Sequence, residues 1–258
     1  HAWDDHATAL RALVLCRLWA ACWASEPNGS PFLRTLLAAI ARHGQKLAAH
    51  SFYRGDHNHG VTQAYALLAI GLLFPSLPQA AEWARAGCAR LEAQTAENVS
   101  AAGVHREHSP FYHFYVFRQL ADARRLGQAY GLSFSPEFEQ RLEAMLAAGA
   151  YLLKPNGTLP ALGDTSAGSP ALATSQDARD FRAPAYLWSS TQGAEGAPPR
   201  ADSVLLPDSG YAVFRSGWGQ QEPVKDERFL VLRLATENSA HIHRDVFSFE
   251  LYAYGDDL

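Results

Sequence analysis

The residues best suited to chemistry lie in His241–Leu251, which has the sequence HIHRDVFSFEL. The segment Val246–Tyr254 is rich in β-branched and aromatic residues, as β-strands are. If the strand begins a few residues earlier, its two-residue period places His241, His243 and Asp245 on one face. Two imidazoles and a carboxylate could bind a metal, or could hold and protonate an anionic substrate. The alternative is a polar strand end with solvent-facing histidines.

A second candidate cluster is the loop at residues 54–60, RGDHNHG, which precedes the most apolar helical segment of the chain. Backbone N–H groups and the helix dipole attract anions at such a helix start. Asp56 or Asn58 alone could cap the helix, but a cap needs only one such side chain. We therefore take His57, Asn58 and His59 as candidate functional residues.

A third cluster is Val104–Tyr115, VHREHSPFYHFY. Its phenylalanines fit a hydrophobic core, whereas a buried Tyr112 hydroxyl or His113 imidazole must find a polar partner. Arg106 and Glu107 add charge beside them. A fourth cluster, residues 3–6 (WDDH), contains Trp3 and His6 as further candidates, although capping of the first helix explains its acidic residues more simply.

Composition excludes several functional classes. The chain has 258 residues and is 48% hydrophobic, so it can form a substantial core. Its formal net charge of −4 does not indicate a nucleic-acid-binding surface. The cysteines show no CxxC spacing, and Cys16 and Cys22, on an apolar predicted helix, are expected to be buried free thiols. The sequence contains no run of 18 apolar residues, the length typical of a membrane-spanning helix. The helical pattern already present at His1 indicates part of a longer protein.

The clusters must be positioned by helices first and strands afterwards. Helical patterns or helix-start signals occur at Ala7–Trp23, Phe32–Ala49, Gly60–Phe74, Gln79–Thr95, Ser109–Tyr130 and 135–153. Short turns join them as three antiparallel hairpins, which predicts an (α/α) toroid or solenoid.

The amino-acid composition changes at Lys154, where a Pro/Gly-rich loop begins. We predict a loop at 154–175, a short helix at Ala178–Ser190, a connection at 193–203, and strands at Gly210–Ser216, Arg228–Ala235 and Val246–Tyr254. Helices followed by strands predict an α+β multidomain chain with a boundary near 195–205.

Five short motifs, in order, resemble the heparinase II/III-like polysaccharide lyases, which include heparin, heparan sulfate and alginate lyases. The motifs are Asp56–Gly60 (DHNHG), Glu107–His113 (EHSPFYH), Leu159–Asp164 (LPALGD), Asp208–Phe214 (DSGYAVF) and His241–Leu251. Each is weak alone, and together they span most of the chain.

The resemblance implies an incomplete (α/α) toroid at residues 1–200, followed at 201–258 by the start of an antiparallel β-sandwich or β-sheet domain. It also implies an acidic polysaccharide as substrate, no required cofactor, and a periplasmic or secreted location. It says nothing about the oligomeric state.

The resemblance also implies residue roles. Asn58 and His59 match the family's Asn-His pair, which binds and neutralises a uronate carboxylate. Tyr112 matches the tyrosine that transfers protons, and His241 a catalytic partner. His243 matches a structural zinc ligand of some members; other ligands would lie beyond Leu258.

Two positions depart from the family pattern. His108 stands where Gln or Gly is expected, and Arg244 interrupts the small residues of the HxHxD segment. The remaining candidate substrate-binding residues are Trp3, His6, His57, Arg106, Glu107 and His113.

The expected reaction is β-elimination, in which the C5 proton of a uronate is removed and the 4-O-linked sugar leaves. Tyr112 could act as base and acid if cationic neighbours lower its pKa, with His241 completing the proton transfer. We expect residues 56–60, 106–113 and 241–245 to converge on one cleft, and Asp164 to be structural.

Two alternatives stay open. Toroids also host glycoside hydrolases that use two carboxylates, for which Asp56, Glu107 and Asp164 are available. A non-catalytic carbohydrate-binding relative would keep the fold without the chemistry. The few arginines in the clusters favour a weakly charged uronate polymer over a sulfated one.

Overall fold

The computed structural model describes residues 3–27, 29–206, 210–234, 241, 243 and 246–258. The chain forms two compact units. Unit 1 comprises His1–Thr95 and Asp122–Ser135, and unit 2 comprises Ala96–Ala121 and Pro136–Leu258. Asp208, Arg244 and Asp245, which belong to two of the motifs, lie outside the described residues.

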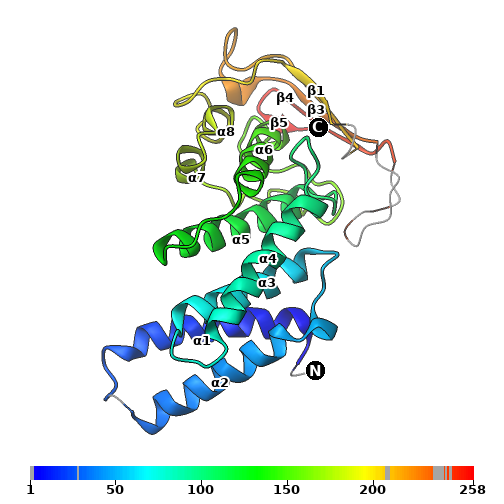
Figure 1. Cartoon of the computed structure of the whole chain (residues 1–258). Coiled ribbons are helices and arrows are strands. Elements are labelled where there is room, and N and C mark those ends of the chain that lie inside the picture. The colour runs from blue at the N-terminus through cyan, green and yellow to red at the C-terminus, as the bar shows by residue number, and fades with distance from the viewer. Residues whose placement is uncertain (1–2, 28, 207–209, 235–240, 242, 244–245) are drawn as a thin grey trace. The chain divides into compact units, whose positions relative to one another are not determined.

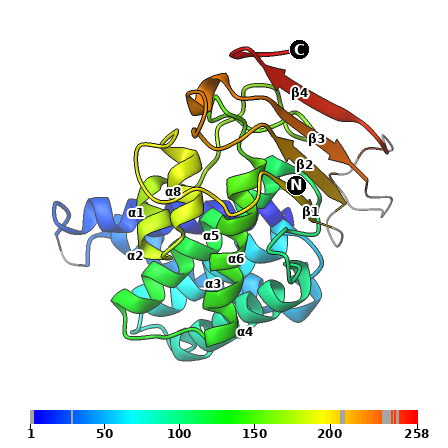
Figure 2. The same cartoon turned by 90° about the horizontal axis from the view of Figure 1, so that it is seen from above.

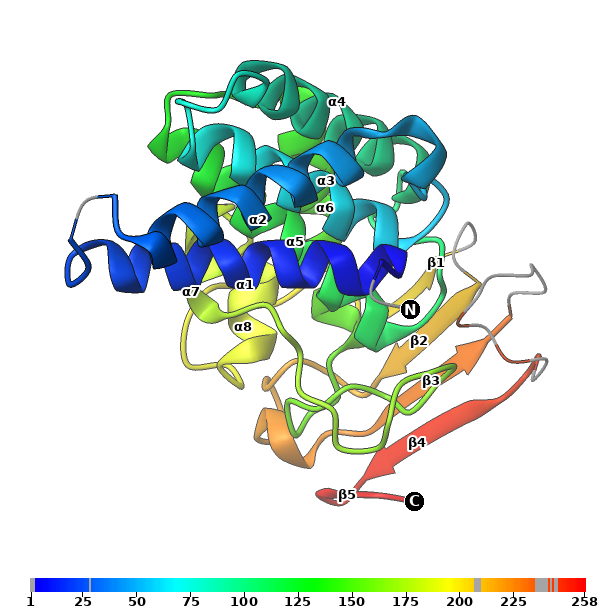
Figure 3. The same cartoon turned by 90° about the horizontal axis from the view of Figure 1, so that it is seen from below.

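Unit 1 is helical. Its elements are α1 (Asp5–Trp23), α2 (Pro31–Ala48), the 3₁₀ turn η1 (His50–Phe52), α3 (Asn58–Leu73) and most of α4 (Ala80–Asn98). Figure 3 shows α2 running alongside α1. The core of unit 1 draws on all four α-helices, with Ile40, Leu67, Ile70 and Trp83 among its buried members. The nearly all-apolar α3 is central to it, as its sequence predicted.

Unit 2 contains the first part of α5 (Pro110–Ala129), α6 (Pro136–Leu152), α7 (Ser175–Asp180) and α8 (Pro184–Ser190) (Figure 1). The six expected long helices are therefore confirmed. The single helix expected at Ala178–Ser190 is wrong. A capping box of Thr174 and Asp177 starts α7 earlier, and the chain then breaks before Pro184 starts α8.

An antiparallel meander closes unit 2, with the strand order β1-β2-β3-β4-β5; Figure 2 shows β1 to β4, and Figure 3 also labels β5. Its strands are β1 (Ser203–Leu206), β2 (Tyr211–Arg215), β3 (Phe229–Arg233), β4 (Phe249–Ala253) and β5 (Asp256–Asp257). The three expected strands are confirmed as β2, β3 and β4. The connection expected to run to 203 gives way at Ser203 to β1, which was not predicted.

The expected extension of β4 back through the histidines is wrong. β4 begins only at Phe249, and neither His241 nor His243 is in a strand. Phe247 has a left-handed φ of 68°, a conformation that interrupts extended backbone. The histidines therefore precede β4 rather than lie on its face.

One face of the sheet packs on α6. Val213, Phe229 and Val231 from β2 and β3 share a buried cluster with Ala148 and Leu152 of α6. These residues alternate along their strands, as expected for a sheet with one covered face. This packing fixes the loops that leave the sheet and the helix.

Buried cations tie those loops to the sheet. Lys154, only 2% exposed, binds the carboxylates of Glu250 on β4 and Asp257 on β5. Arg233 at the end of β3 is fully buried, and its guanidinium donates to the carbonyl of His243 at 3.0 Å. Buried charges need such partners, so both contacts restrain the backbone near the predicted site.

The helix-first, sheet-second architecture confirms the predicted α+β class. The two compact units do not correspond to the predicted division near residue 200, which stays a prediction. Among the described residues, no helix has the length and apolarity that a bilayer crossing requires.

Candidate active site

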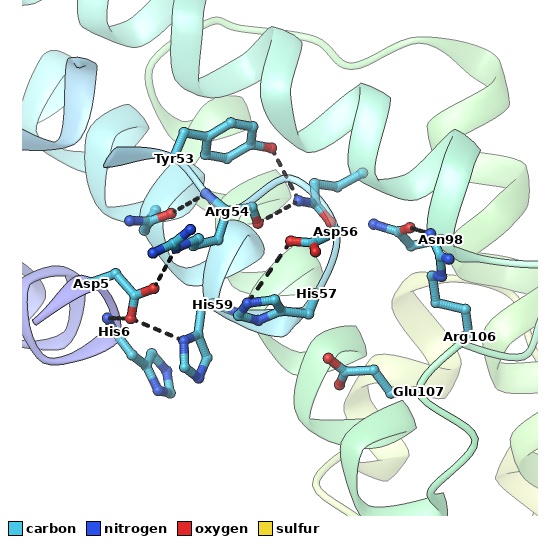
Figure 4. A network of polar contacts seen from close by, with 12 residues as sticks. Asp5, His6, Tyr53, Arg54, Asp56, His57, His59, Asn98, Arg106 and Glu107 are labelled. Carbon is cyan, nitrogen blue, oxygen red and sulfur yellow. Dashed lines mark hydrogen bonds and ion pairs between the residues drawn. The ribbon is translucent and has the colours of Figure 1, made fainter. Parts of the chain in front are cut away.

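In unit 1, one carboxylate organises the predicted histidine cluster. Asp5, in the first turn of α1, accepts from Arg54 Nε at 3.0 Å and pairs with His59 Nδ1 at 3.1 Å (Figure 4). Burial acts to raise the pKa of Asp5, but the bond from Arg54, the backbone bond from His6 and His59 lower it below its usual value. Asp5 is therefore an anion that fixes two cationic or hydrogen-bonding side chains.

The imidazoles of this cluster lie against one another. His59 stacks on His6 with ring centroids 4.2 Å apart and meets His57 edge-on at 4.4 Å. Burial and then the charge of His59 lower the pKa of His6. The cluster therefore favours neutral His6 beside an Asp5-bound His59.

The start of α3 is held by a buried glutamine and a close backbone approach. Gln63 accepts from the backbone of Arg54 and donates to the carbonyl of Phe52, both at 2.8 Å. A Cβ on Gly60 would strike the carbonyl of Arg54, so only glycine allows the loop to fold back there. The helix start is thereby fixed.

His57, rather than Asp56 or Asn58, caps α3. Its Nδ1 accepts from the backbone N–H of His59 at 3.2 Å. Asn58 is only 1% exposed, whereas the Asp56 carboxylate is largely in solvent. Trp3, also a candidate substrate-binding residue, contacts His43, Arg11 and Arg42.

In unit 2, Tyr112 and His241 form a close pair. Their rings are stacked with centroids 3.5 Å apart and an angle of 11° between planes. Tyr112 lies in the first turn of α5, and His241 precedes β4. Two of the segments expected to converge therefore do so, from positions far apart in the chain.

Asp164 holds both histidines of the HxH segment. Its carboxylate oxygens pair with His241 Nδ1 at 2.8 Å and His243 Nε2 at 2.7 Å. Its backbone N–H also donates to the carbonyl of His241 at 3.2 Å. The hydrogen bonds from the histidines lower the pKa of Asp164. Asp164 thus acts as an orienting anion, and its position supports the expectation of a structural role.

A buried carboxylate lies beyond the tyrosine–histidine pair. Glu107, 1% exposed, has its Oε2 4.0 Å from His241 Nε2 and 3.8 Å from His105 Nδ1. Burial, followed by the charges of His113 and His108, lowers the pKa of His105 to about 3. His105 is thus a neutral neighbour of Glu107 that the sequence analysis did not single out.

The start of α5 is anchored by the loop that carries Asp164. Thr165 Oγ1 accepts from the backbone of Phe111 at 3.0 Å and lies 2.9 Å from Ser109 Oγ. The hydroxyl of Tyr211 on β2 donates to the carbonyl of His108 at 2.6 Å. His108, the residue that departs from the family pattern, adopts a left-handed φ of 52°.

His113, a predicted substrate-binding residue, is enclosed between α5 and α6. It is 1% exposed, and its Nε2 lies 3.0 Å from the carbonyl of Met145 on α6. Burial lowers its pKa to about 4. A neutral imidazole enclosed in this way positions α5 against α6, and its substrate-binding role stays a prediction. Arg106, by contrast, is exposed and is held by Asn98 through a 2.9 Å bond (Figure 4).

The lowered pKa that would let Tyr112 act as both base and acid is not found among the described residues. Burial raises the pKa of Tyr112, and the negative charges of Asp164 and Glu107 raise it further. The resting Tyr112 side chain is therefore a neutral phenol, suited to donating a proton.

The predicted zinc ligand His243 is engaged by Asp164 rather than gathered with further donors. Within the part of the chain that the structure describes, no three His, Cys, Asp or Glu side chains are arranged to hold a metal ion. Zinc binding and the absence of a required cofactor stay predictions. So does the convergence of residues 56–60 with the site of unit 2.

The family follows from comparison with known sequences. The family described as Heparinase II/III N-terminus matches residues 1–183, more than half of the chain. The chain belongs to the heparinase II/III family. Heparin-sulfate lyases from Pedobacter heparinus and Bacteroides stercoris are 27% and 25% identical to it, over 90% of the chain in both cases. The chain spans only 35% of each of these relatives.

Solved structures support the fold. A crystal structure of heparinase III superposes with a TM-score of 0.88 at 23% identity, covering 99% of this chain and 42% of that one. The heparan sulfate lyase HepC from Pedobacter heparinus gives a TM-score of 0.73 at 24% identity, covering 40% of that chain. The predicted incomplete toroid followed by the start of a β-sheet domain is thereby confirmed.

Proposed function

We propose that the full protein is a polysaccharide lyase that cleaves a uronic-acid-containing polysaccharide by β-elimination. The observation that carries the proposal is the Tyr112–His241 stack, with His241 held by Asp164. A phenol and an imidazole at one point supply the proton donor and proton acceptor that elimination needs. Family membership and the heparin-sulfate lyase relatives support the same class. A periplasmic or secreted location, in keeping with an extracellular polymer, belongs to this proposal.

The first requirement of the reaction is neutralisation of the uronate carboxylate. The C5 proton is only weakly acidic while the adjacent carboxylate resists further negative charge, so preorganised donors must stabilise the developing enolate. Asn58 and His59, at the N-terminus of α3, suit this role. Asp5 fixes the His59 ring at 3.1 Å, which prepares it before substrate arrives.

The second requirement is proton transfer. Because burial and the Asp164 and Glu107 carboxylates keep Tyr112 protonated, the phenol is best placed to protonate the leaving oxygen. His241, oriented through Nδ1, takes the C5 proton. This division replaces the idea that one tyrosine performs both steps. Glu107 and Asp164 act through His241 as positioning residues.

The hydrolase alternative finds less support in the geometry. A glycoside hydrolase needs two carboxyl groups directed at one glycosidic bond. Both oxygens of Asp164 are engaged by His241 and His243, and Glu107 is buried between His105 and His241. The carboxylates of Asp164 and Glu107 are thus directed at imidazoles rather than at a glycosidic bond.

The test is an elimination assay on the full-length protein with a panel of uronate polysaccharides, sulfated and unsulfated. Elimination creates a conjugated double bond that absorbs ultraviolet light, whereas hydrolysis releases reducing ends without it. We expect both signals to rise together. Reducing ends without new absorbance would establish a hydrolase, and binding without cleavage of any polymer would establish a non-catalytic relative.

Tyr112→Phe is the decisive variant, because it removes one hydroxyl and keeps the ring that stacks on His241. We expect kcat to fall by roughly 10²–10⁴-fold, as for other lost acid–base groups, while KM changes little. An unchanged thermal melt is the control for folding. A variant that eliminates at a near wild-type rate would remove Tyr112 from the chemistry and leave His241 as the proton donor to test.

A further inference from the structure

A pocket in unit 1 lies where α2 passes the start of α1. Its volume is about 460 Å³, and its lining residues are Trp3, Arg42, Gln45, Lys46 and Ala49. Arg42, Gln45 and Lys46 are three and four residues apart along α2 and so form one exposed stripe, and Ala49 follows directly after the helix. The volume is within the range of small-ligand sites.

Trp3 provides an aromatic wall, and two guanidinium groups lie over its ring. Arg11 and Arg42 lie 5.5 Å and 5.9 Å from its ring centroid, and 38% of the Trp3 residue is exposed. An arginine beside an aromatic ring is held flat and can still present donors at its edge to a carboxylate or sulfate. The remaining indole surface can receive the apolar face of a sugar ring.

A neutral histidine fixes this wall from within. His43, buried beneath Trp3 with ring centroids 5.0 Å apart, binds the Ala39 carbonyl through Nδ1 at 2.7 Å and accepts from Arg11 Nε at 2.9 Å through Nε2. Burial lowers the pKa of His43, and the charges of Arg11 and Arg42 act in the same direction. The bond through Nε2 therefore orients Arg11 toward the indole.

The lining is cationic. Arg42 and Lys46 contribute two positive charges, Gln45 adds an amide, and none of the lining residues is acidic. The chain as a whole carries a net charge of −4, so this concentration of positive charge is local. An uncharged sugar would leave the two cations without a matching anion.

We propose that this pocket is a binding subsite for an anionic sugar residue of an acidic polysaccharide, with the ring on Trp3 and its carboxylate or sulfate on Arg42 and Lys46. The identity of the polymer rests on the proposed function, but binding at this pocket requires no catalysis. The pocket would hold the polymer through a sugar that is not the one being cleaved.

The experiment measures equilibrium binding by calorimetry to full-length protein carrying Tyr112→Phe, so that the probe is not consumed. The probes are an unsulfated tetrasaccharide of glucuronic acid and N-acetylglucosamine, its sulfated counterpart, and neutral chitotetraose. Arg42→Gln/Lys46→Gln removes the charges and Trp3→Ala removes the platform. Arg17→Gln, an exposed cation on α1 outside the lining, is the matched control.

We expect an acidic tetrasaccharide to lose about tenfold in affinity for one site in the double variant and in Trp3→Ala, and to bind the Arg17→Gln protein normally. Binding of the sulfated probe alone would identify sulfate as the anion, and binding of both would identify the carboxylate. Equal affinity of the double variant and the control would overturn the subsite, as would equal binding of chitotetraose. Pocket binding without elimination by the protein carrying the native Tyr112 would refute the proposed lyase function and leave the subsite intact.

Discussion

Gly163 offers the sharpest test of the geometry around His241. It lies in the loop that carries Asp164 and adopts a left-handed φ of 57°. A Cβ at this position would stand 2.6 Å from the carbonyl oxygen of His241. Gly163→Ala therefore adds one methyl group directly against the backbone that places the imidazole proposed to take the C5 proton.

Two costs can be separated. The left-handed backbone penalises alanine by about 1 kcal/mol relative to glycine. The contact adds a displacement, because an ordinary Cβ contact begins at 3.4 Å and the carbonyl of His241 must retreat by the difference, about 0.8 Å. A misplacement of about 1 Å at a catalytic group can cost roughly 10²-fold in rate. We expect kcat to fall roughly 10- to 100-fold.

Gly168→Ala is the matched control. It lies five residues away in the same loop, at a φ of 73°, and a Cβ there would meet nothing within 4 Å. Both variants should lose a similar free energy of unfolding, about 1 kcal/mol, but Gly168→Ala should keep kcat within about twofold. Elimination kinetics and thermal melts on full-length protein compare the two.

The result that would refute this reasoning is equal activity of the two variants at equal stability. It would show that the His241 backbone does not need its observed position. A Gly163→Ala protein that fails to fold would be followed by Gly163→Ser with the same control, Gly168→Ser. The test depends on the kcat of the Gly163 variant being lower than that of the matched Gly168 variant.

Three further predictions concern single side chains. Asp164→Asn keeps the shape of the carboxylate but loses its charge, so kcat should fall by roughly tenfold with KM nearly unchanged; an unaltered kcat would leave Asp164 as a loop residue only. His59→Ala should lower kcat/KM by roughly 10²-fold through both kcat and KM, because carboxylate neutralisation acts in the ground state and the transition state; a change confined to KM would make His59 a binding residue alone. His105, with a folded pKa of about 3 against 6.5 when unfolded, should stabilise fully only above pH 6.5, and its protonation in the unfolded chain should cost about 2 kcal/mol of stability at pH 5. Denaturant unfolding of His105→Leu should show a correspondingly smaller acid loss than wild type, and an identical pH slope would contradict the burial argument.

The long helices and three strands could be predicted because local pattern decides them. The apolar composition of α3 demanded burial wherever the helix lay, and the alternation of β2 and β3 matched their one covered face. The missed elements are short. β1 has four residues and β5 has two, and both exist through pairing with a neighbouring strand rather than through their own pattern.

The histidine pair lies together for a different structural reason from the one that the sequence indicated. His241 and His243 were expected to share the face of a strand, but they precede β4 and converge because both reach the carboxylate of Asp164. The sequence separation of 77 residues between Asp164 and His241 hides this contact from any local pattern. The family resemblance identified the two histidines, whereas tertiary packing explains why they lie together.

The segment SPFYH does not show which of the neighbours Tyr112 and His113 faces His241. Successive residues of a helix point about 100° apart, so only one of them can face His241. The structure directs Tyr112 to that imidazole and His113 to the carbonyl of Met145 in the core. Because α5 is fixed by its packing on α6 and by Thr165, its rotation is a property of the folded unit. Partial burial and the Asp164 and Glu107 carboxylates raise the pKa of Tyr112, so in the proposed reaction the tyrosine meets its substrate as an acid.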